Sequence, residues 1–100
     1  MNIWLTNLKN SQRIKELGVE IPCTYYWQKQ ITWFTHVFKA EGSYPAYTLD
    51  QLFPVLQEIG KTKEWEDYKL ETVEYCFLRI CELVTTDPEA AQGYLSMLLE

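Results

Sequence analysis

One β-rich segment, residues 19–48, most constrains what this chain can fold into. Its sequence, VEIPCTYYWQKQITWFTHVFKAEGSYPAYT, is dense in the β-branched and aromatic residues that fit a pleated surface. Two runs, 24–28 and 31–39, flank a short polar break at Lys29 and Gln30, which suits a hairpin. The segment therefore predicts one small antiparallel sheet.

Two further features of this segment set expectations for the sheet. A turn over residues 41–43 precedes a short run, 44–47, which is long enough for a third strand. Along the second run, successive side chains point to opposite faces of the strand, and both faces carry large apolar groups. We therefore expect helices to cover one face. Because a domain of 100 residues needs its large apolar groups inside, we expect the sheet aromatics and their neighbours to be mainly core, namely Tyr26, Ile31, Trp33, Phe34 and Phe38.

Helical patterns lie on both sides of the β-rich segment. Asn7 is a good N-cap, and Gly18 is placed to end a helix, which together predict a helix over about 8–17. The pair Thr48 and Gln51 has the spacing of a capping box and opens a second helix. We expect that helix to end at Gly60 and to bend or split at Pro54, because proline removes a backbone hydrogen bond.

The last third of the chain predicts two more helices after a charged loop over residues 60–68. The first has apolar residues on one helical face, at Val73, Cys76, Phe77, Ile80, Cys81 and Val84. The second begins with Asp87 as N-cap and Pro88 in the first helical position. It contains Gly93, which costs up to about 1 kcal/mol inside a helix, so we expect another element to approach closely there.

These elements place the chain in the α+β class. We expect a small two- or three-stranded antiparallel sheet with about four helices packed mainly on one face. Residues 1–100 form a single domain on this interpretation, because the chain is the length of one ordinary domain.

Composition disfavours several classes of partner, although a local basic patch stays possible. The chain has nine basic and fourteen acidic residues, a net charge of −5, which disfavours nucleic acids and anionic membrane surfaces. No stretch reaches the eighteen apolar residues of a membrane span, and the N-terminus does not resemble a signal peptide. The three cysteines, Cys23, Cys76 and Cys81, fit no zinc or disulfide spacing, so we expect reduced thiols and a cytoplasmic protein.

No catalytic, cofactor-binding or metal-binding set can be written from the sequence. His36 is the only histidine, and the Gly60-Lys61-Thr62 tripeptide lacks the earlier glycine of a phosphate-binding loop. Carboxylates crowd residues 64–74, but lysines are interleaved with them, which is typical of a solvated loop. We therefore expect a protein that is not an enzyme and uses no cofactor.

Three blocks of the sequence carry a resemblance to other proteins: LKNSQRIKELGVEIPCTYYW, YPAYTLDQLFPVLQEI and DPEAAQGYLSMLLE. The chain resembles a loose family of short proteins encoded in bacterial prophages and mobile elements. Those proteins have a helix ending in a Leu-Gly pair, an aromatic strand and a C-terminal helix with small residues early and leucines late. The resemblance implies a mobile-element setting and a fold type, and it brings no activity and no functional residues.

The aromatic content favours a protein-binding function. Fifteen percent of the residues are aromatic, more than a small core comfortably hides, and exposed aromatic patches mark interfaces. We expect an acidic interaction domain that binds a protein partner or a second copy of itself through a patch that includes Tyr25, Trp27 and Trp65. Two alternatives stay open: a mimic of nucleic-acid charge that blocks a DNA-binding protein, and an enzyme that uses the carboxylates Glu64, Glu66, Asp67, Glu71 and Glu74.

Overall fold

The fold is α+β, as the sequence predicts, with a three-stranded antiparallel sheet and four helices. The computed structural model describes residues 3–29 and 32–100, except for the side chains of residues 67–70. The predicted break at Gln30 and the predicted core position of Ile31 lie outside the described residues. Along the chain the elements are α1 (Leu8–Glu16), β1 (Tyr25–Lys29), β2 (Trp33–His36), β3 (Tyr44–Ala46), α2 (Leu49–Thr62), α3 (Asp67–Thr86) and α4 (Pro88–Leu99).

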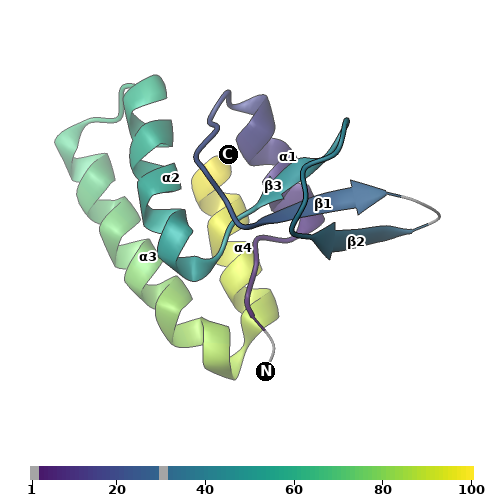
Figure 1. The fold of residues 1–100 in the computed structure, drawn as a ribbon. Helices are drawn as coiled ribbons and strands as arrows, with labels where there is room; N and C mark the ends of the chain where they lie inside the picture. Colours follow the sequence, from purple (N-terminus) through teal and green to yellow (C-terminus); the bar gives the residue numbers. More distant parts are fainter. Residues whose placement is uncertain (1–2, 30–31) are drawn as a thin grey trace.

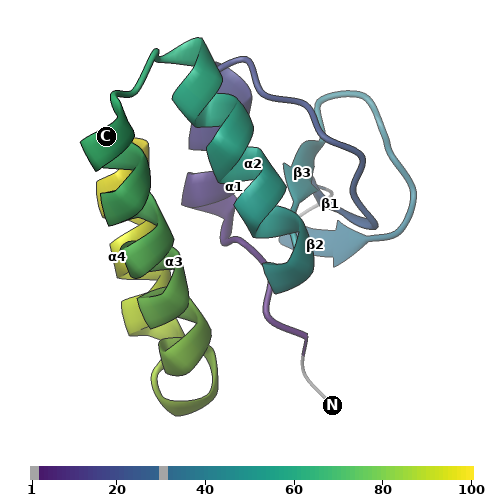
Figure 2. The same cartoon turned by 90° about the vertical axis from the view of Figure 1, so that its left-hand side faces the viewer.

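The sheet has the strand order β2-β1-β3, so β1 is the central strand. Trp27 at its middle lies opposite Thr35 of β2 on one side and Tyr44 of β3 on the other. The third strand is therefore present, and it pairs with β1 rather than with β2. The hairpin of β1 and β2 extends from the side of the molecule, while α2, α3 and α4 lie on the other side (Figure 1). The turned view shows α3 beside α4 (Figure 2).

The helix boundaries follow the capping signals in the sequence. The Asn7 side chain accepts a hydrogen bond of 2.8 Å from the backbone N–H of Asn10 and starts α1. Asp87 does the same for Ala90 at the start of α4, at 3.2 Å. Gly18 ends the first helical segment with a φ of 79°, a left-handed conformation that glycine adopts without steric cost.

The prediction that α2 ends at Gly60 is wrong, and of the bend or split predicted at Pro54, the split does not occur. The helix runs from Leu49 to Thr62 with both residues inside it. Pro54 leaves the carbonyl of Asp50 without its usual backbone donor. Because both of these residues are exposed, water is available to that carbonyl, and the helix continues past the proline.

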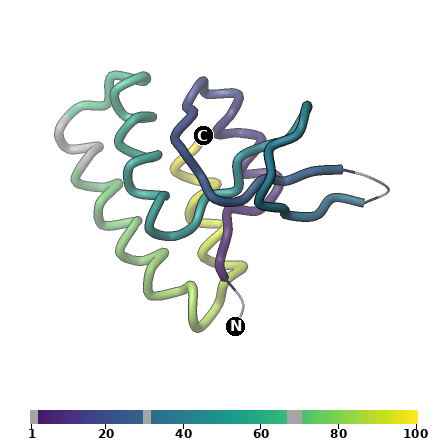
Figure 3. The backbone as a smooth tube through the Cα atoms, viewed as in Figure 1, coloured from purple at the N-terminus to yellow at the C-terminus, as the bar shows by residue number. Residues whose placement is uncertain are grey.

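The core is built by the helices together with Val19 and Tyr47, and the sheet contributes little to it. Its buried members are Ile14, Val19, Tyr47, Leu52, Val55, Leu56, Ile59, Val73, Ile80, Ala91, Leu95, Leu98 and Leu99. Among the described strand residues, only Ala46 is buried. The backbone trace shows why: β3 lies near α1, whereas the β1–β2 hairpin runs beyond the helices (Figure 3).

The expectation that the sheet aromatics are mainly core is therefore wrong for the described residues. Tyr26, Trp33 and Phe34 are only partly buried, and Phe38 is 70% exposed. Four helices already supply enough apolar side chains to fill the interior, so the hairpin is not needed for that purpose. Its aromatic side chains are left with a different role.

Candidate functional site

The hairpin has two faces, which the strand register defines. Trp27 lies opposite Thr35 and Lys29 opposite Trp33, so these residues share one face, here called the Trp27 face. Tyr26 lies opposite His36 and Gln28 opposite Phe34, and these residues form the other, the Tyr26 face. The two faces differ in what covers them.

The Trp27 face is turned toward the N-terminal segment and α1. The indole Nε1 of Trp27 donates a hydrogen bond of 2.9 Å to the buried carbonyl of Thr6. The ring centroids of Trp33 and Tyr44 lie 5.7 Å apart. Lys29 Nζ lies 5.9 Å from the centroid of Trp33, and Lys15 Nζ lies 5.1 Å from the centroid of Tyr44. This face is therefore already occupied by contacts within the chain, including two of cation–π type.

The Tyr26 face carries an exposed aromatic row. Phe34 meets the ring of His36 edge-on at 6.3 Å between centroids, and the ring of Phe38 lies 5.2 Å from His36. The backbone N–H of Phe38 donates to His36 Nδ1 at 3.1 Å, and the Gln28 side chain donates to the Phe38 carbonyl. These contacts hold the row in place although Phe38 is 70% exposed. Exposed, preorganised aromatic groups are typical of protein-binding surfaces.

Cys23 lies next to this face and is not an activated thiol. A hydrogen bond joins its thiol to Tyr26, and that bond, together with burial, raises the pKa of Tyr26. Burial raises the pKa of Cys23 and outweighs the opposing effects of the Tyr26 bond and the charge of Lys39. Both groups are therefore neutral at physiological pH, and a thiolate nucleophile is not favoured there.

The predicted patch residues lie in two separate places. Tyr25 and Trp27 are two residues apart on β1 and so point to the same face. Tyr25 also lines a cleft of about 530 Å³ with Trp4, Leu49 and Thr48. Trp65 lies in the connection between α2 and α3, where it is partly buried and packs against the core. That connection is at the far side of the molecule from the hairpin (Figure 1), so the fold does not bring all three residues together.

Sequence reasoning missed two features of the hairpin. The first feature is which face of the hairpin is covered. The sequence shows that side chains alternate between two faces, but the covered face depends on how the hairpin lies against the helices. The second feature is charge: residues 1–40 have five basic and two acidic residues, a net charge of +3, whereas residues 41–100 have four and twelve, a net charge of −8. The whole-chain value of −5 conceals this separation.

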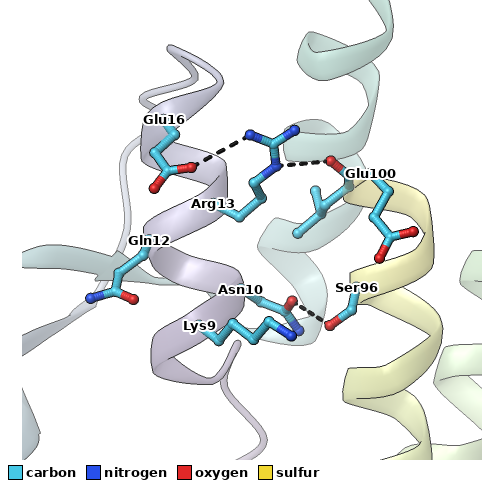
Figure 4. A pocket seen from close by; sticks show the side chains of 8 residues that line it. Lys9, Asn10, Gln12, Arg13, Glu16, Ser96 and Glu100 are labelled. Atoms are coloured by element: carbon cyan, nitrogen blue, oxygen red, sulfur yellow. Dashed lines mark hydrogen bonds and ion pairs between the residues drawn. The ribbon is translucent and has the colours of Figure 1, made fainter.

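The cleft between α1 and α4 is held by structural contacts (Figure 4). Arg13 Nε donates to the carbonyl of Leu99 at 3.2 Å, and the Ser96 hydroxyl donates to Asn10 Oδ1 at 2.7 Å. A guanidinium at a helix C-terminus satisfies a carbonyl and complements the helix dipole. The polar groups that line this cleft are therefore largely used in joining the two helices.

The carboxylates of the 64–74 region lie at the α2–α3 connection and along α3. Glu64 precedes the helix with a φ of 54°, Glu66 is the N-cap residue, and Glu71 and Glu74 are exposed on the helix. The side chain of Asp67 lies outside the described residues. Within the described part of the chain, no three His, Cys, Asp or Glu side chains are grouped closely enough to hold a metal ion.

Comparisons with known proteins find no match, so the assignment of a function depends on the geometry of the site. No protein-family model, curated protein or solved structure matches the chain. In the described residues, none of the helices is both long and apolar enough to cross a membrane.

Proposed function

We propose that the chain is a small, non-enzymatic protein-binding module whose contact surface is the Tyr26 face of the hairpin. The observation that carries the proposal is the aromatic row of Phe34, His36 and Phe38, which is ordered by its own contacts and left uncovered by the helices. An apolar row held in place before binding loses little conformational entropy when a partner covers it. The mobile-element setting implied by the sequence resemblance belongs to the same proposal.

The edge of β2 supports a particular mode of binding. Within the described residues, β2 pairs only with β1, so its other edge is free. Its sequence, Trp-Phe-Thr-His, contains none of the lysines or prolines that often protect sheet edges from pairing. A partner segment in extended conformation can add there as a fourth strand, and every second side chain of that strand would then lie beside the aromatic row.

Charge complementarity specifies the partner further. The hairpin and its flanks, residues 21–40, contain Lys39 beside the Tyr26 face, Lys29 on the Trp27 face, and no acidic residue. An acidic segment is attracted to such a surface, and the attraction raises the rate of association most at low salt. The proposed partner is therefore another protein that presents an extended segment with apolar and acidic side chains.

A capture experiment with matched variants tests the proposal. The wild type, Phe38→Ser and Met97→Ser are used as baits in nuclease-treated cell lysate, and bound proteins are identified by mass spectrometry. Met97 on α4 is 68% exposed, nearly the same as Phe38 at 70%, so it controls for the loss of an exposed apolar group. We expect a protein that the wild type and Met97→Ser retain and that Phe38→Ser loses.

Two outcomes contradict the proposal. A partner retained equally by all three baits binds elsewhere on the molecule. Light scattering of the purified chain could instead show a concentration-dependent dimer that Phe38→Ser abolishes. The occupant of this surface would then be a second copy of the chain, and the proposal of a different protein as partner would be wrong.

A charge mimic of nucleic acid is the second candidate, and one observation favours it. On α3 the exposed carboxylates Glu71, Glu74 and Glu82 lie at helical spacings that place them on one side. This candidate predicts capture of a DNA-binding protein that is lost when these three are changed to glutamine and is unaffected by Phe38→Ser. It also predicts that raising the salt concentration releases the captured protein.

A further inference from the structure

A cavity of about 250 Å³ lies beside the Tyr26 face and has the chemistry of an anion site. It is formed where the segment after α1, the end of the hairpin and the start of β3 meet. Its polar lining comes from Lys15, Lys39, Ser43, Tyr26, Cys23 and Glu20. The volume is several times the roughly 30 Å³ that one water occupies in the liquid, so there is room for a larger polar group.

Two ammonium groups line this cavity. Lys39 makes no ion pair with any described residue. Lys15 donates to the carbonyl of Ser43 at 3.1 Å through one of its three N–H groups, which leaves donors for a ligand. Glu20 lies in the same lining without an ion pair to either lysine, so the charge of the lining is positive by one unit.

Ser43 supplies a second and independent observation. The residue is only 4% exposed, and its hydroxyl has no hydrogen-bond partner among the described residues. A buried hydroxyl without a partner costs free energy, because it has lost its bonds to water. Its oxygen has almost no accessible surface, so the hydroxyl reaches an acceptor oxygen in the cavity only after a change of side-chain rotamer, while Lys15 already fixes the backbone at this residue.

We infer that this cavity is an oxyanion site, which binds a carboxylate or phosphate group through Lys39, Lys15 and the hydroxyl of Ser43. Oxyanions are pure acceptors, and these three side chains are all donors. The thiol of Cys23 and the hydroxyl of Tyr26, which are both uncharged at neutral pH, complete the lining. Under the proposed function, the anion is an acidic group of the partner segment, in the part that continues past Phe38 from its pairing with β2.

The site can be tested on the isolated chain by NMR titration. Inorganic phosphate in one arm and acetate in the other are added to ¹⁵N-labelled protein at constant ionic strength, with chloride as the background anion. We expect saturable shifts of the backbone amides of Ser43, Lys39 and Tyr26. Saturation by both anions indicates a site for carboxylates in general, and saturation by phosphate alone assigns it to phosphoryl groups.

Variants separate the site from general attraction to lysines. Lys39→Gln is expected to weaken binding about tenfold, because a charge-assisted hydrogen bond is lost. Ser43→Ala is expected to weaken it several-fold, and Lys61→Gln, on an exposed lysine of α2, is expected to have no effect. Because Ser43→Ala could disturb the preceding turn, its fold is checked from amides outside residues 39–47.

The inference is overturned if the shifts rise linearly without saturation, or if Lys39→Gln and Lys61→Gln behave alike. The titration contains no partner protein, so its failure would remove the oxyanion site and leave the aromatic surface as proposed. Conversely, if the capture experiment contradicted the proposed partner, the anion binding measured in the titration would be unaffected.

Discussion

Tyr26 on β1 lies directly opposite His36 on β2, and this pair joins the aromatic row to the oxyanion cavity. The ring of His36 lies between Phe34 and Phe38, while Tyr26 lines the cavity with Lys39 and Ser43. Because opposite residues of antiparallel strands place their side chains side by side, the two features form one continuous surface. An extended segment paired with the free edge of β2 would place apolar side chains beside the row, and its continuation past Phe38 would bring an acidic group to the cavity.

The aromatic row is expected to contribute to binding and very little to folding. Phe38→Ser should change the free energy of unfolding by no more than about 0.5 kcal/mol, because the side chain is largely exposed already. Urea unfolding of the wild type and the variant measures this difference. A loss of 2 kcal/mol or more, well above the range typical of surface substitutions, would show that Phe38 is part of the structural core after all.

A buried polar network between α1 and α4 is expected to be important for stability. Gln92 accepts hydrogen bonds from the Asn7 backbone and the Asn10 side chain, each at 3.0 Å, and donates one to the Leu5 carbonyl at 2.6 Å. Gln92→Ala removes these three bonds, although Asn10 keeps its bond of 3.1 Å to the backbone carbonyl of residue 92, and it should destabilise the chain by about 1–3 kcal/mol.

The control for that substitution is Gln12→Ala, at the rim of the α1–α4 cleft. Gln12 is partly exposed and lies on the same helix as Asn10. Its replacement should change the midpoint of thermal unfolding by far less than Gln92→Ala does. Equal effects of the two would mean that the network adds nothing specific.

Gly93→Ala is expected to stabilise the chain. The sequence predicts a close neighbour at this glycine, but the structure shows no atom within 4 Å of the position that a Cβ would occupy, apart from its own helix and chain neighbours. Alanine should therefore gain about 0.5–1 kcal/mol from its higher helix propensity. A rise in the melting temperature measures this gain, and a fall would show that another group approaches Gly93 in solution.

The stability of the chain is expected to fall at alkaline pH because of Tyr47. Burial raises the pKa of this fully buried tyrosine above its ordinary value of about 10, and the hydrogen bond from the Ile21 N–H only partly opposes the shift. With the folded-state pKa raised, its contribution is complete below the ordinary value and is lost as the pH rises through the folded pKa.

Replacing that hydroxyl gives the corresponding test. Tyr47→Phe leaves the Ile21 N–H without its acceptor, so the variant should be less stable at neutral pH by about 1–3 kcal/mol. Its stability should then depend less on pH above 10 than that of the wild type. Parallel curves of unfolding free energy against pH for the two proteins would exclude Tyr47 as the group responsible.

Local signals predict much of this fold. Asn7, Asp87, Pro88 and Gly18 mark helix ends, and each acts where the sequence places it, because caps depend on residues within one turn. At Pro54 the sequence predicts a bend or a split without deciding between them, since the cost of proline depends on whether water can reach the freed carbonyl, and the helix continues.

The candidate surface depends on tertiary placement, which local patterns do not contain. A strand with apolar groups on both faces is typical of a covered sheet, so Phe34 and Phe38 were expected inside. The extension of the hairpin beyond the helices decides their exposure, and only the assembled fold shows it (Figure 1). The predicted patch of Tyr25, Trp27 and Trp65 stays a prediction, with Trp65 set apart from the other two.

The most direct measurement of the central claim is amide hydrogen exchange of the chain with and without its captured partner. Binding by strand addition predicts slower exchange across Trp33–His36 and at Phe38, with the exchange of α3 amides unchanged. Protection confined to α3, or an absence of any protection in residues 33–38, would contradict the account and place the contact surface elsewhere.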